Sequence, residues 1–156
     1  MIANDTIINF RNAIHETLEI HGQSNDQNSS GRDAGAYTGK IVSVGAGAES
    51  GFAAGMRPMS LRTDAYLFIR HYGHKDPTYR VWCENHEIGT PDVRIAWMQG
   101  SSWQDISGER DMDENTTFEI THRGYRFQVH RWSNGKEPLD DYDEWYTRFF
   151  VTMSFA

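Results

Sequence analysis

A pair of alternating runs constrains the fold of this 156-residue chain more than any other feature. TFEITH (117–122) and YRFQVHRW (125–132) flank the dipeptide Arg123-Gly124. In the second run, apolar side chains alternate with polar ones: Tyr125, Phe127 and Val129 against Arg126, Gln128 and His130. A period of two puts one set on a buried face and the other in water. The two runs therefore predict an antiparallel hairpin.

Four further runs have the β-branched and aromatic composition of strands. They are AYLFIRHY (65–72), YRVWCEN (79–85), VRIAWMQ (93–99) and FFVTMSF (149–155). Aromatic residues make up 13% of the chain, and tight turns are expected between the runs, among them Asn134-Gly135. We therefore expect a mainly β protein, an antiparallel β-sandwich of the jelly-roll kind with an N-terminal helix.

The helix is predicted over residues 1–21. Apolar side chains recur there at roughly helical spacing: Ile7, Ile8, Phe10, Ile14 and Leu18. Asn4 or Asp5 can cap its start, and Gly22 can end it. Residues 22–36 are rich in Gly, Ser and Asn and are expected to be a flexible linker. Residues 37–156 would then form the sandwich domain.

Composition excludes several classes of protein. The formal net charge of −7, from 15 basic and 22 acidic side chains, argues against a nucleic-acid partner. The sequence shows neither an apolar run long enough to cross a membrane nor a secretory signal, so stable membrane insertion is not expected and the localisation stays open. The glycines of 43–58 are not followed by Gly-Lys-Ser/Thr, so they predict turns or an edge strand rather than a phosphate-binding loop.

Two pairs of residues have the spacing of zinc ligands, His71-x-x-His74 and Cys83-x-x-His86. Positions three apart in a strand point to opposite faces, so each pair would need a turn to converge. The single cysteine also excludes an internal disulfide. We expect no cofactor, with zinc at these four residues as one alternative. Calcium on an acidic segment is another: Glu137, Asp140, Asp141, Asp143 and Glu144.

Another set mixes aromatic and polar side chains on neighbouring predicted strands. An aromatic ring stacks on the apolar face of a pyranose, and planar donors and acceptors pair with its hydroxyls. We therefore predict a carbohydrate-binding site formed by the six residues of this set: His71, Arg80, Asn85, Trp103, Glu109 and Arg110.

The order of these motifs also has a counterpart in a known family. The chain runs through AYLFIRHYGHK (65–75), RVWCEN (80–85), WQDISGER (103–110) and TTFEITHRGYRFQVHRWSNGK (116–136). This succession resembles that of galectins, jelly-roll sandwiches whose site runs through His-x-Asn-Pro-Arg, Val-x-Asn and Trp-x-x-Glu-x-Arg. His71 is not followed by Asn-Pro-Arg, and Trp103 and Glu109 are more widely spaced than in that motif. The resemblance implies a galectin-like or concanavalin-like lectin sandwich over residues 60–156, without galactoside specificity.

The leading functional hypothesis is a non-catalytic, lectin-like module whose partner is a glycan. A structural or assembly subunit of a larger particle, such as a virion or tail component, is the main alternative, because a terminal strand can add to another sheet and give a homo-oligomer. A zinc-dependent enzyme and a membrane-active protein led by the N-terminal helix are less favoured.

Overall fold

The computed structural model describes residues 4–24, 41–54, 62–75, 77–86, 89–132, 135–139 and 142–156. Within these ranges the chain forms thirteen strands and no helix. The strands are β1 (Asn4–Ala13), β2 (Leu18–Ser24), β3 (Val42–Val44), β4 (Glu49–Ala54), β5 (Arg62–His71), β6 (Tyr79–His86), β7 (Asp92–Gln99), β8 (Ser102–Asp105), β9 (Arg110–Asp111), β10 (Thr117–His122), β11 (Tyr125–Arg131), β12 (Gly135–Leu139) and β13 (Tyr142–Phe155).

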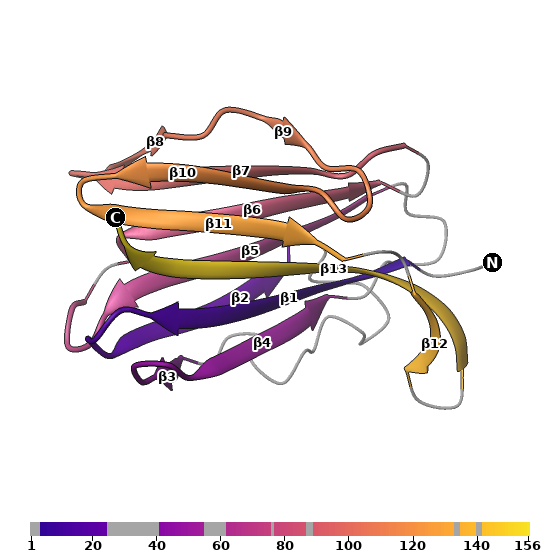
Figure 1. Ribbon diagram of the computed structural model, residues 1–156, viewed down its shortest axis with the longest axis horizontal. Helices are drawn as coiled ribbons and strands as arrows, with labels where there is room; N and C mark the ends of the chain where they lie inside the picture. Colours follow the sequence, from indigo (N-terminus) through magenta and orange to yellow (C-terminus); the bar gives the residue numbers. More distant parts are fainter. Residues whose placement is uncertain are drawn as a thin grey trace.

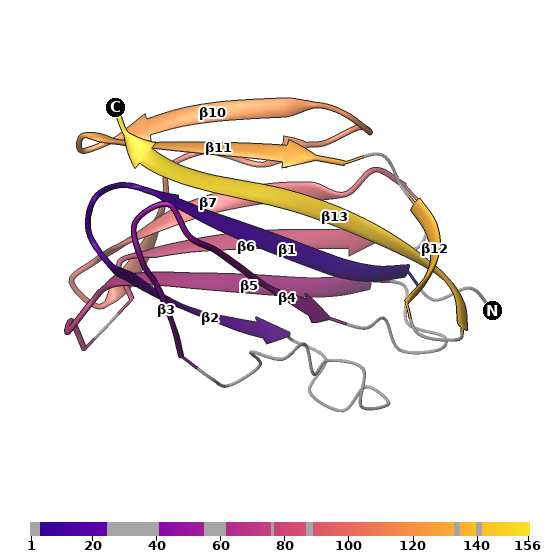
Figure 2. The same cartoon turned by 60° about the horizontal axis from the view of Figure 1, so that its bottom comes forward.

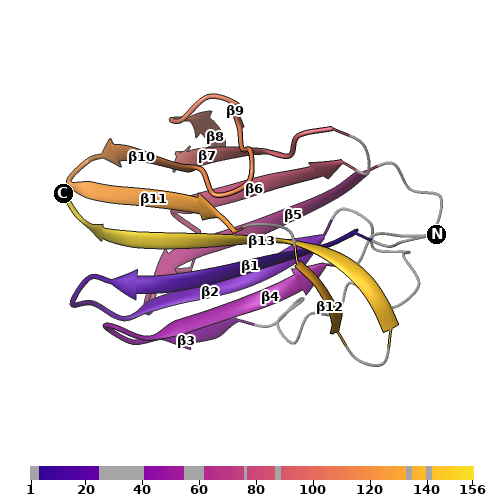
Figure 3. The ribbon, with the colours of Figure 1, turned by 45° about the vertical axis from the view of Figure 1, so that its right-hand side comes forward.

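These strands form two sheets that pack face to face. The six-stranded sheet has the order β10-β11-β13-β1-β4, with β12 paired to β13. The seven-stranded sheet has the order β3-β2-β5-β6-β7-β8, with β9 paired to β7. In Figure 1 the six-stranded sheet lies in front of the other, and Figure 3 shows the two layers from a second side. The prediction of a mainly β, two-sheet sandwich is confirmed.

The predicted N-terminal helix over residues 1–21 is wrong. Its described part forms β1 and β2, which belong to different sheets, so both strands are part of the sandwich itself. Residues 22–24 complete β2, and the rest of the predicted linker, 25–36, lies outside the described residues. The described N-terminal segment therefore contributes strands to both layers of the sandwich.

Buried polar residues obscure the strand alternation of the N-terminal segment, so its hydropathy pattern resembles that of a helix. The inward positions of β1 include two polar side chains, because the buried Ile8 and Phe10 are flanked by the fully buried Thr6 and Asn12. Asn12 Nδ2 donates hydrogen bonds to the carbonyls of Glu16 (2.7 Å) and Val44 (2.8 Å). Because its hydrogen bonds allow Asn12 to be buried, a polar residue stands where the alternation of a strand would place an apolar one. A search for apolar residues at every second position therefore does not detect this strand.

β1 departs from the antiparallel plan because it runs parallel to β13, with Asn4 opposite Trp145 and Ala13 opposite Ser154. Figure 2 shows the indigo β1 beside the yellow β13. The other strand pairs among the described residues are antiparallel. On its other side β1 pairs with β4, where a Cβ on Gly51 would lie 2.8 Å from the carbonyl oxygen of Ile8. Glycine thus lets this edge strand approach closely.

The hairpin predicted at 117–132 is confirmed. His122 pairs with Tyr125 across a two-residue turn in which Arg123 and Gly124 have φ angles of 51° and 86°. Positive φ at both central residues is typical of a type I′ turn, whose backbone twist matches that of the two flanking strands. Along β11 the inward Phe127 and Val129 are fully buried, as the alternation predicts. Of the second predicted turn, Asn134 lies outside the described residues and Gly135 begins β12.

The core fills the space between the two sheets. Fully buried side chains come from both layers, among them Phe10, Phe127 and Phe149 from one sheet and Leu67 and Val81 from the other. Because side chains alternate along each strand, the residues between these core positions point outward. Core packing therefore does not determine which side chains stand on the two outer faces of the sandwich.

Candidate ligand-binding site

The outer face of the seven-stranded sheet carries aromatic rings on neighbouring strands. Along β5, the inward Leu67 and Ile69 alternate with outward Tyr66 and Phe68. Along β6, the inward Val81 alternates with outward positions that carry ring and guanidinium groups. We call this surface the aromatic face and define it by five outward-pointing, half-buried side chains: His21, Tyr66, Phe68, Trp82 and Trp103.

The rings of the aromatic face contact one another in a continuous series. His21 stacks on Phe68 with a centroid separation of 4.8 Å, and Phe68 lies 5.9 Å from Trp103. Tyr66 is 6.2 Å from Phe68 and 5.5 Å from Trp82, at interplanar angles of 20° and 26°. These separations lie in the range of attractive aromatic pairs. The face is therefore a pre-arranged apolar platform that spans β2, β5, β6 and β8.

Arg80 lies at the centre of this platform. Its guanidinium carbon is 4.9 Å from the ring centroid of Trp103, 5.6 Å from that of Trp82 and 5.9 Å from that of Tyr66. Its side chain makes neither a hydrogen bond nor an ion pair within the described part of the chain. Burial lowers the pKa of Arg80, against the opposing influence of Tyr66 and Asp105. Arg80 is thus a cation held by ring contacts with its donors unused.

A second feature is an open depression of about 540 Å³ at the end of the sandwich where β5 finishes. His71 is its central group. Its Nδ1 lies 3.1 Å from the Glu16 carboxylate, and its Nε2 is 3.3 Å from the Tyr125 hydroxyl. An ionised carboxylate only accepts, so His71 Nδ1 is the donor toward Glu16. Burial, and then the charge of Glu16, raises the pKa of Tyr125.

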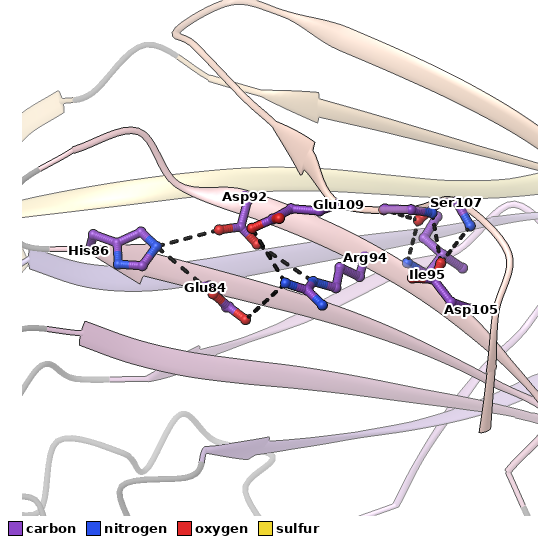
Figure 4. Close-up of polar contacts among 9 residues, drawn as sticks. Glu84, His86, Asp92, Arg94, Ile95, Asp105, Ser107 and Glu109 are labelled. Carbon is purple, nitrogen blue, oxygen red and sulfur yellow. Dashed lines mark hydrogen bonds and ion pairs between the residues drawn. The ribbon is translucent and has the colours of Figure 1, made fainter. Parts of the chain in front are cut away.

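A third feature lies at the opposite end of β6, where Glu84, His86 and Asp92 form what we call the acid–histidine cluster (Figure 4). His86 Nε2 is 3.4 Å from Asp92 Oδ2 and 3.9 Å from Glu84 Oε2. Arg94 approaches the same group, with Nη2 3.9 Å from Glu84 Oε1. Burial, followed by the charge of Glu84, raises the pKa of the Asp92 carboxyl to about 6, against the opposing hydrogen bond with His86.

The loop after β8 places Glu109 beside this cluster. Ser107 Oγ accepts a hydrogen bond from the Ile95 amide (2.8 Å), and Asp105 Oδ1 accepts from the amides of Ser107 (3.0 Å) and Gly108 (2.6 Å). These bonds tie the loop to β7, as Figure 4 shows. Glu109 then reaches Arg94 with an oxygen–nitrogen distance of 3.3 Å.

The six residues predicted to bind a ligand lie in several places. Arg80 and Trp103 come together on the aromatic face. His71 lies in the depression at the end of β5, and Glu109 belongs to the surroundings of the acid–histidine cluster. Asn85 points inward, is 1% exposed, and donates to Thr6 Oγ1 at 2.9 Å.

Arg110, the sixth predicted ligand residue, lies at β9. Its guanidinium is 5.4 Å from the Phe118 ring centroid, and its Nε donates to the Ser107 carbonyl. It therefore holds the edge of the sandwich together rather than facing the aromatic platform.

The four residues considered as zinc ligands are distributed over the two ends of the same strand pair. Ile69 pairs with Tyr79 at one end of β5 and β6, near His71 and His74, whereas Arg62 pairs with His86 at the other. Cys83 is fully buried in the core, and burial raises the pKa of its thiol well above the usual range. The described residues therefore do not gather these four side chains into one site. The acidic segment 137–144, considered for calcium, has no described side chains.

Sequence reasoning missed most of the aromatic face. Tyr66, Phe68 and Trp82 were treated only as strand formers, although each occupies an outward position beside the core residues. The sequence did carry a signal. In AYLFIRHY (65–72), one set of alternate positions holds Tyr66, Phe68 and Arg70. In YRVWCEN (79–85), one set of alternate positions holds Arg80 and Trp82. Large rings at water-facing positions on adjacent strands indicate a binding surface.

Comparisons with protein-family models and with curated proteins gave no match to this chain. The galectin-like resemblance therefore has no support from relatives, and only the two-sheet sandwich architecture is shared with lectins of that kind. Among the described residues, no helix has the length and hydropathy needed to cross a bilayer. The function has to be argued from the geometry of the three features above.

Proposed function

We propose that this protein is a non-catalytic carbohydrate-binding module and that its ligand lies on the aromatic face. The observation that carries the proposal is the position of Arg80, whose guanidinium carbon is 4.9 Å from the Trp103 ring centroid amid contiguous rings. A binding surface of this kind combines apolar contact area with unused hydrogen-bond donors.

Carbohydrate is the ligand class that this combination fits best. A pyranose has C–H faces that pack on aromatic rings and a rim of hydroxyls that accept hydrogen bonds. Tyr66, Trp82 and Trp103 supply the rings around Arg80. The Nε of Arg80 is buried, but the planar guanidinium also carries N–H donors on its two Nη atoms, which can pair with neighbouring sugar oxygens or with a carboxylate of an acidic sugar.

The extent of the platform favours an oligosaccharide over a single sugar. Ring contacts continue from His21 through Phe68 to Trp103, with centroid separations of 4.8 and 5.9 Å. The platform lies on the outside of a sheet and not in an enclosed cleft, so a chain of sugars can lie along it. The rings and the guanidinium of this face offer contact area and hydrogen-bond donors, which are the properties that binding requires.

A glycan array with matched tryptophan variants tests the proposal. Trp103→Ala removes a ring in contact with Arg80, whereas Trp132→Ala removes an exposed ring from the other sheet. We expect selective glycan binding by the unmodified protein and by Trp132→Ala, and a loss of at least about tenfold in affinity for Trp103→Ala. Absence of glycan binding, or equal binding by both variants, would overturn the proposal.

Arg80→Gln separates the role of the cation from that of the rings. Gln keeps a planar amide but loses the charge and most of the donors. We expect weaker binding of all glycans, with the largest loss for glycans that carry carboxylate or sulfate groups.

A further inference from the structure

We propose that Glu84, His86 and Asp92 bind a divalent transition-metal ion and that Zn²⁺ is the best match. This inference is independent of carbohydrate binding. Glu84 and His86 are outward-facing positions two residues apart on β6, and Asp92 begins β7 directly opposite Glu84. Two adjacent strands thus bring one imidazole and two carboxylates to a single place, where their ligand atoms all lie within 4.8 Å of one another (Figure 4).

The spacing of the ligand atoms is that of a coordination sphere. Two ligands about 2.0–2.1 Å from a tetrahedral zinc ion are about 3.3 Å apart. His86 Nε2 lies 3.4 Å from Asp92 Oδ2 and 3.9 Å from Glu84 Oε2. Both separations exceed the roughly 2.9 Å of a well-formed N–H···O hydrogen bond. A metal ion between the three atoms would make closer contacts with them than the long hydrogen bond and ion pair that they make with one another.

The Asp92 carboxylate gives an independent indication that this cluster binds a cation. It is 3% exposed, and its Oδ1 accepts no hydrogen bond from any described residue. The cation approaching that oxygen is Arg94, whose Nε is 4.0 Å away. A buried carboxylate oxygen without a donor is costly, so such a group is usually paired or coordinated to a metal.

The charges around the cluster also favour a dication. Arg94 is the guanidinium shared by three carboxylates, at 3.9 Å from Glu84, 4.0 Å from Asp92 and 3.3 Å from Glu109. Asp111 adds a further carboxylate, because it forms a second group of closely spaced oxygens with Asp92 and Glu109. A bound divalent ion would interact favourably with this group of carboxylates.

The donor set selects the kind of metal. Calcium and magnesium prefer spheres made wholly of oxygen, whereas imidazole nitrogen suits zinc and its neighbours in the first transition row. Binding through His86 Nε2 requires the neutral ring with its proton on Nδ1. Three protein ligands leave one position of a tetrahedral ion for water. The site is therefore of the open kind, where β6 ends and β7 begins.

Titration calorimetry with Zn²⁺, followed by metal analysis after gel filtration, tests the assignment. His86→Gln and Asp92→Asn each remove one ligand, and His130→Gln and Glu119→Gln are matched controls on the outer face of the six-stranded sheet. We expect one equivalent of Zn²⁺ for the unmodified chain and both controls. Each ligand variant should lose about 10–100-fold in affinity or more. Cobalt(II) should give the intense visible absorption of a tetrahedral site, and His86→Gln should remove it.

Three results would overturn the assignment: no binding of Zn²⁺, binding unchanged by His86→Gln, or binding lost in His71→Gln or His74→Gln instead. Tighter binding of Ca²⁺ than of Zn²⁺ would also contradict it. His86 is 30% exposed on its side chain, so His86→Gln keeps the test valid even where Asp92→Asn disturbs folding. Glycan binding is measured separately, because a lectin without zinc and a zinc site without glycan binding are distinguishable outcomes.

Discussion

The two outer faces of the sandwich obey the same strand alternation and yet differ in composition. The outer face of the six-stranded sheet, which we call the polar face, carries short polar and charged side chains at most outward positions: Thr117, Glu119, Thr121, Arg126, Gln128, His130, Thr152 and Ser154. Among its described side chains, rings gather at one end, where Trp132 lies 5.7 Å from Phe150. The aromatic face has contiguous rings with Arg80 among them.

This difference separates what folding requires from what binding requires. A sheet needs apolar side chains only on the face that covers the core, so its outer face is free to be polar. The polar face illustrates that default. The aromatic face departs from it, and grouped rings exposed on a protein surface are typical of interaction sites. The comparison therefore favours the outer face of the seven-stranded sheet as the place where the proposed ligand binds.

The comparison depends on side chains alternating between the core and the outer face along each strand. The reactivity of Cys83 tests this alternation most strongly in β6. Cys83 is fully buried, while its neighbour Trp82 points outward from the same strand. Burial raises the pKa of the thiol, so little thiolate forms at neutral pH. We expect a disulfide reagent to modify Cys83 roughly a thousandfold more slowly in the native protein than in urea. Rapid modification of the native chain would mean that β6 presents the wrong face to the core.

The next test compares one substitution on each outer face. Trp82→Ala removes a ring that contacts Tyr66 and lies 5.6 Å from the Arg80 guanidinium and 5.1 Å from that of Arg94. We expect it to lower the free energy of unfolding by about 2 kcal/mol. Gln128→Ala on the polar face should change that free energy by less than about 0.5 kcal/mol. Urea denaturation measures both, and equal effects would show that the rings of the aromatic face do not stabilise one another.

The smallest expected effect concerns pH. Burial, and then the charge of Arg70, lowers the pKa of His21, which stacks on Phe68. The unfolded chain, with an ordinary histidine pKa near 6.5, binds more protons than the folded protein once the pH drops below that value. Stability from this group is therefore full above about pH 6.5 and is lost as pH falls through the lower folded pKa.

His21→Gln should reduce the loss of stability between pH 8 and pH 5, as measured by urea midpoints. An identical loss in the variant and the unmodified chain would place the responsible proton elsewhere. His122 is the other histidine whose pKa burial lowers, and it lies inside the sandwich against Tyr79.

The sequence was informative wherever inward positions were apolar. The alternation of Phe127 and Val129 predicted β11 and its hairpin, because burial on one side is visible as a period of two. It failed at β1, where the buried Thr6 and Asn12 occupy inward positions and are satisfied by hydrogen bonds. A pattern based on hydropathy cannot identify a polar residue whose partners come from a different part of the chain.

The candidate sites were predictable only in part. Arg80 and Trp103 belong to the same predicted set, and the structure places the Arg80 guanidinium carbon 4.9 Å from the Trp103 ring centroid. The acid–histidine cluster was not, since Glu84 and Asp92 become neighbours only through the register of β6 against β7. Register depends on loop lengths and bulges that a single sequence does not reveal.

Indole resonances give the most direct measurement of the central claim. Trp82 and Trp103 lie on the aromatic face, Trp132 is on the opposite side of the molecule and Trp97 points inward. In a ¹H–¹⁵N spectrum titrated with oligosaccharides, we predict that the N–H signals of Trp82 and Trp103 shift with the signals of Tyr66 and Phe68, while that of Trp132 stays in place. Shifts confined to Trp132 or to the His71 depression, or no shift with any neutral or acidic oligosaccharide, would contradict the account.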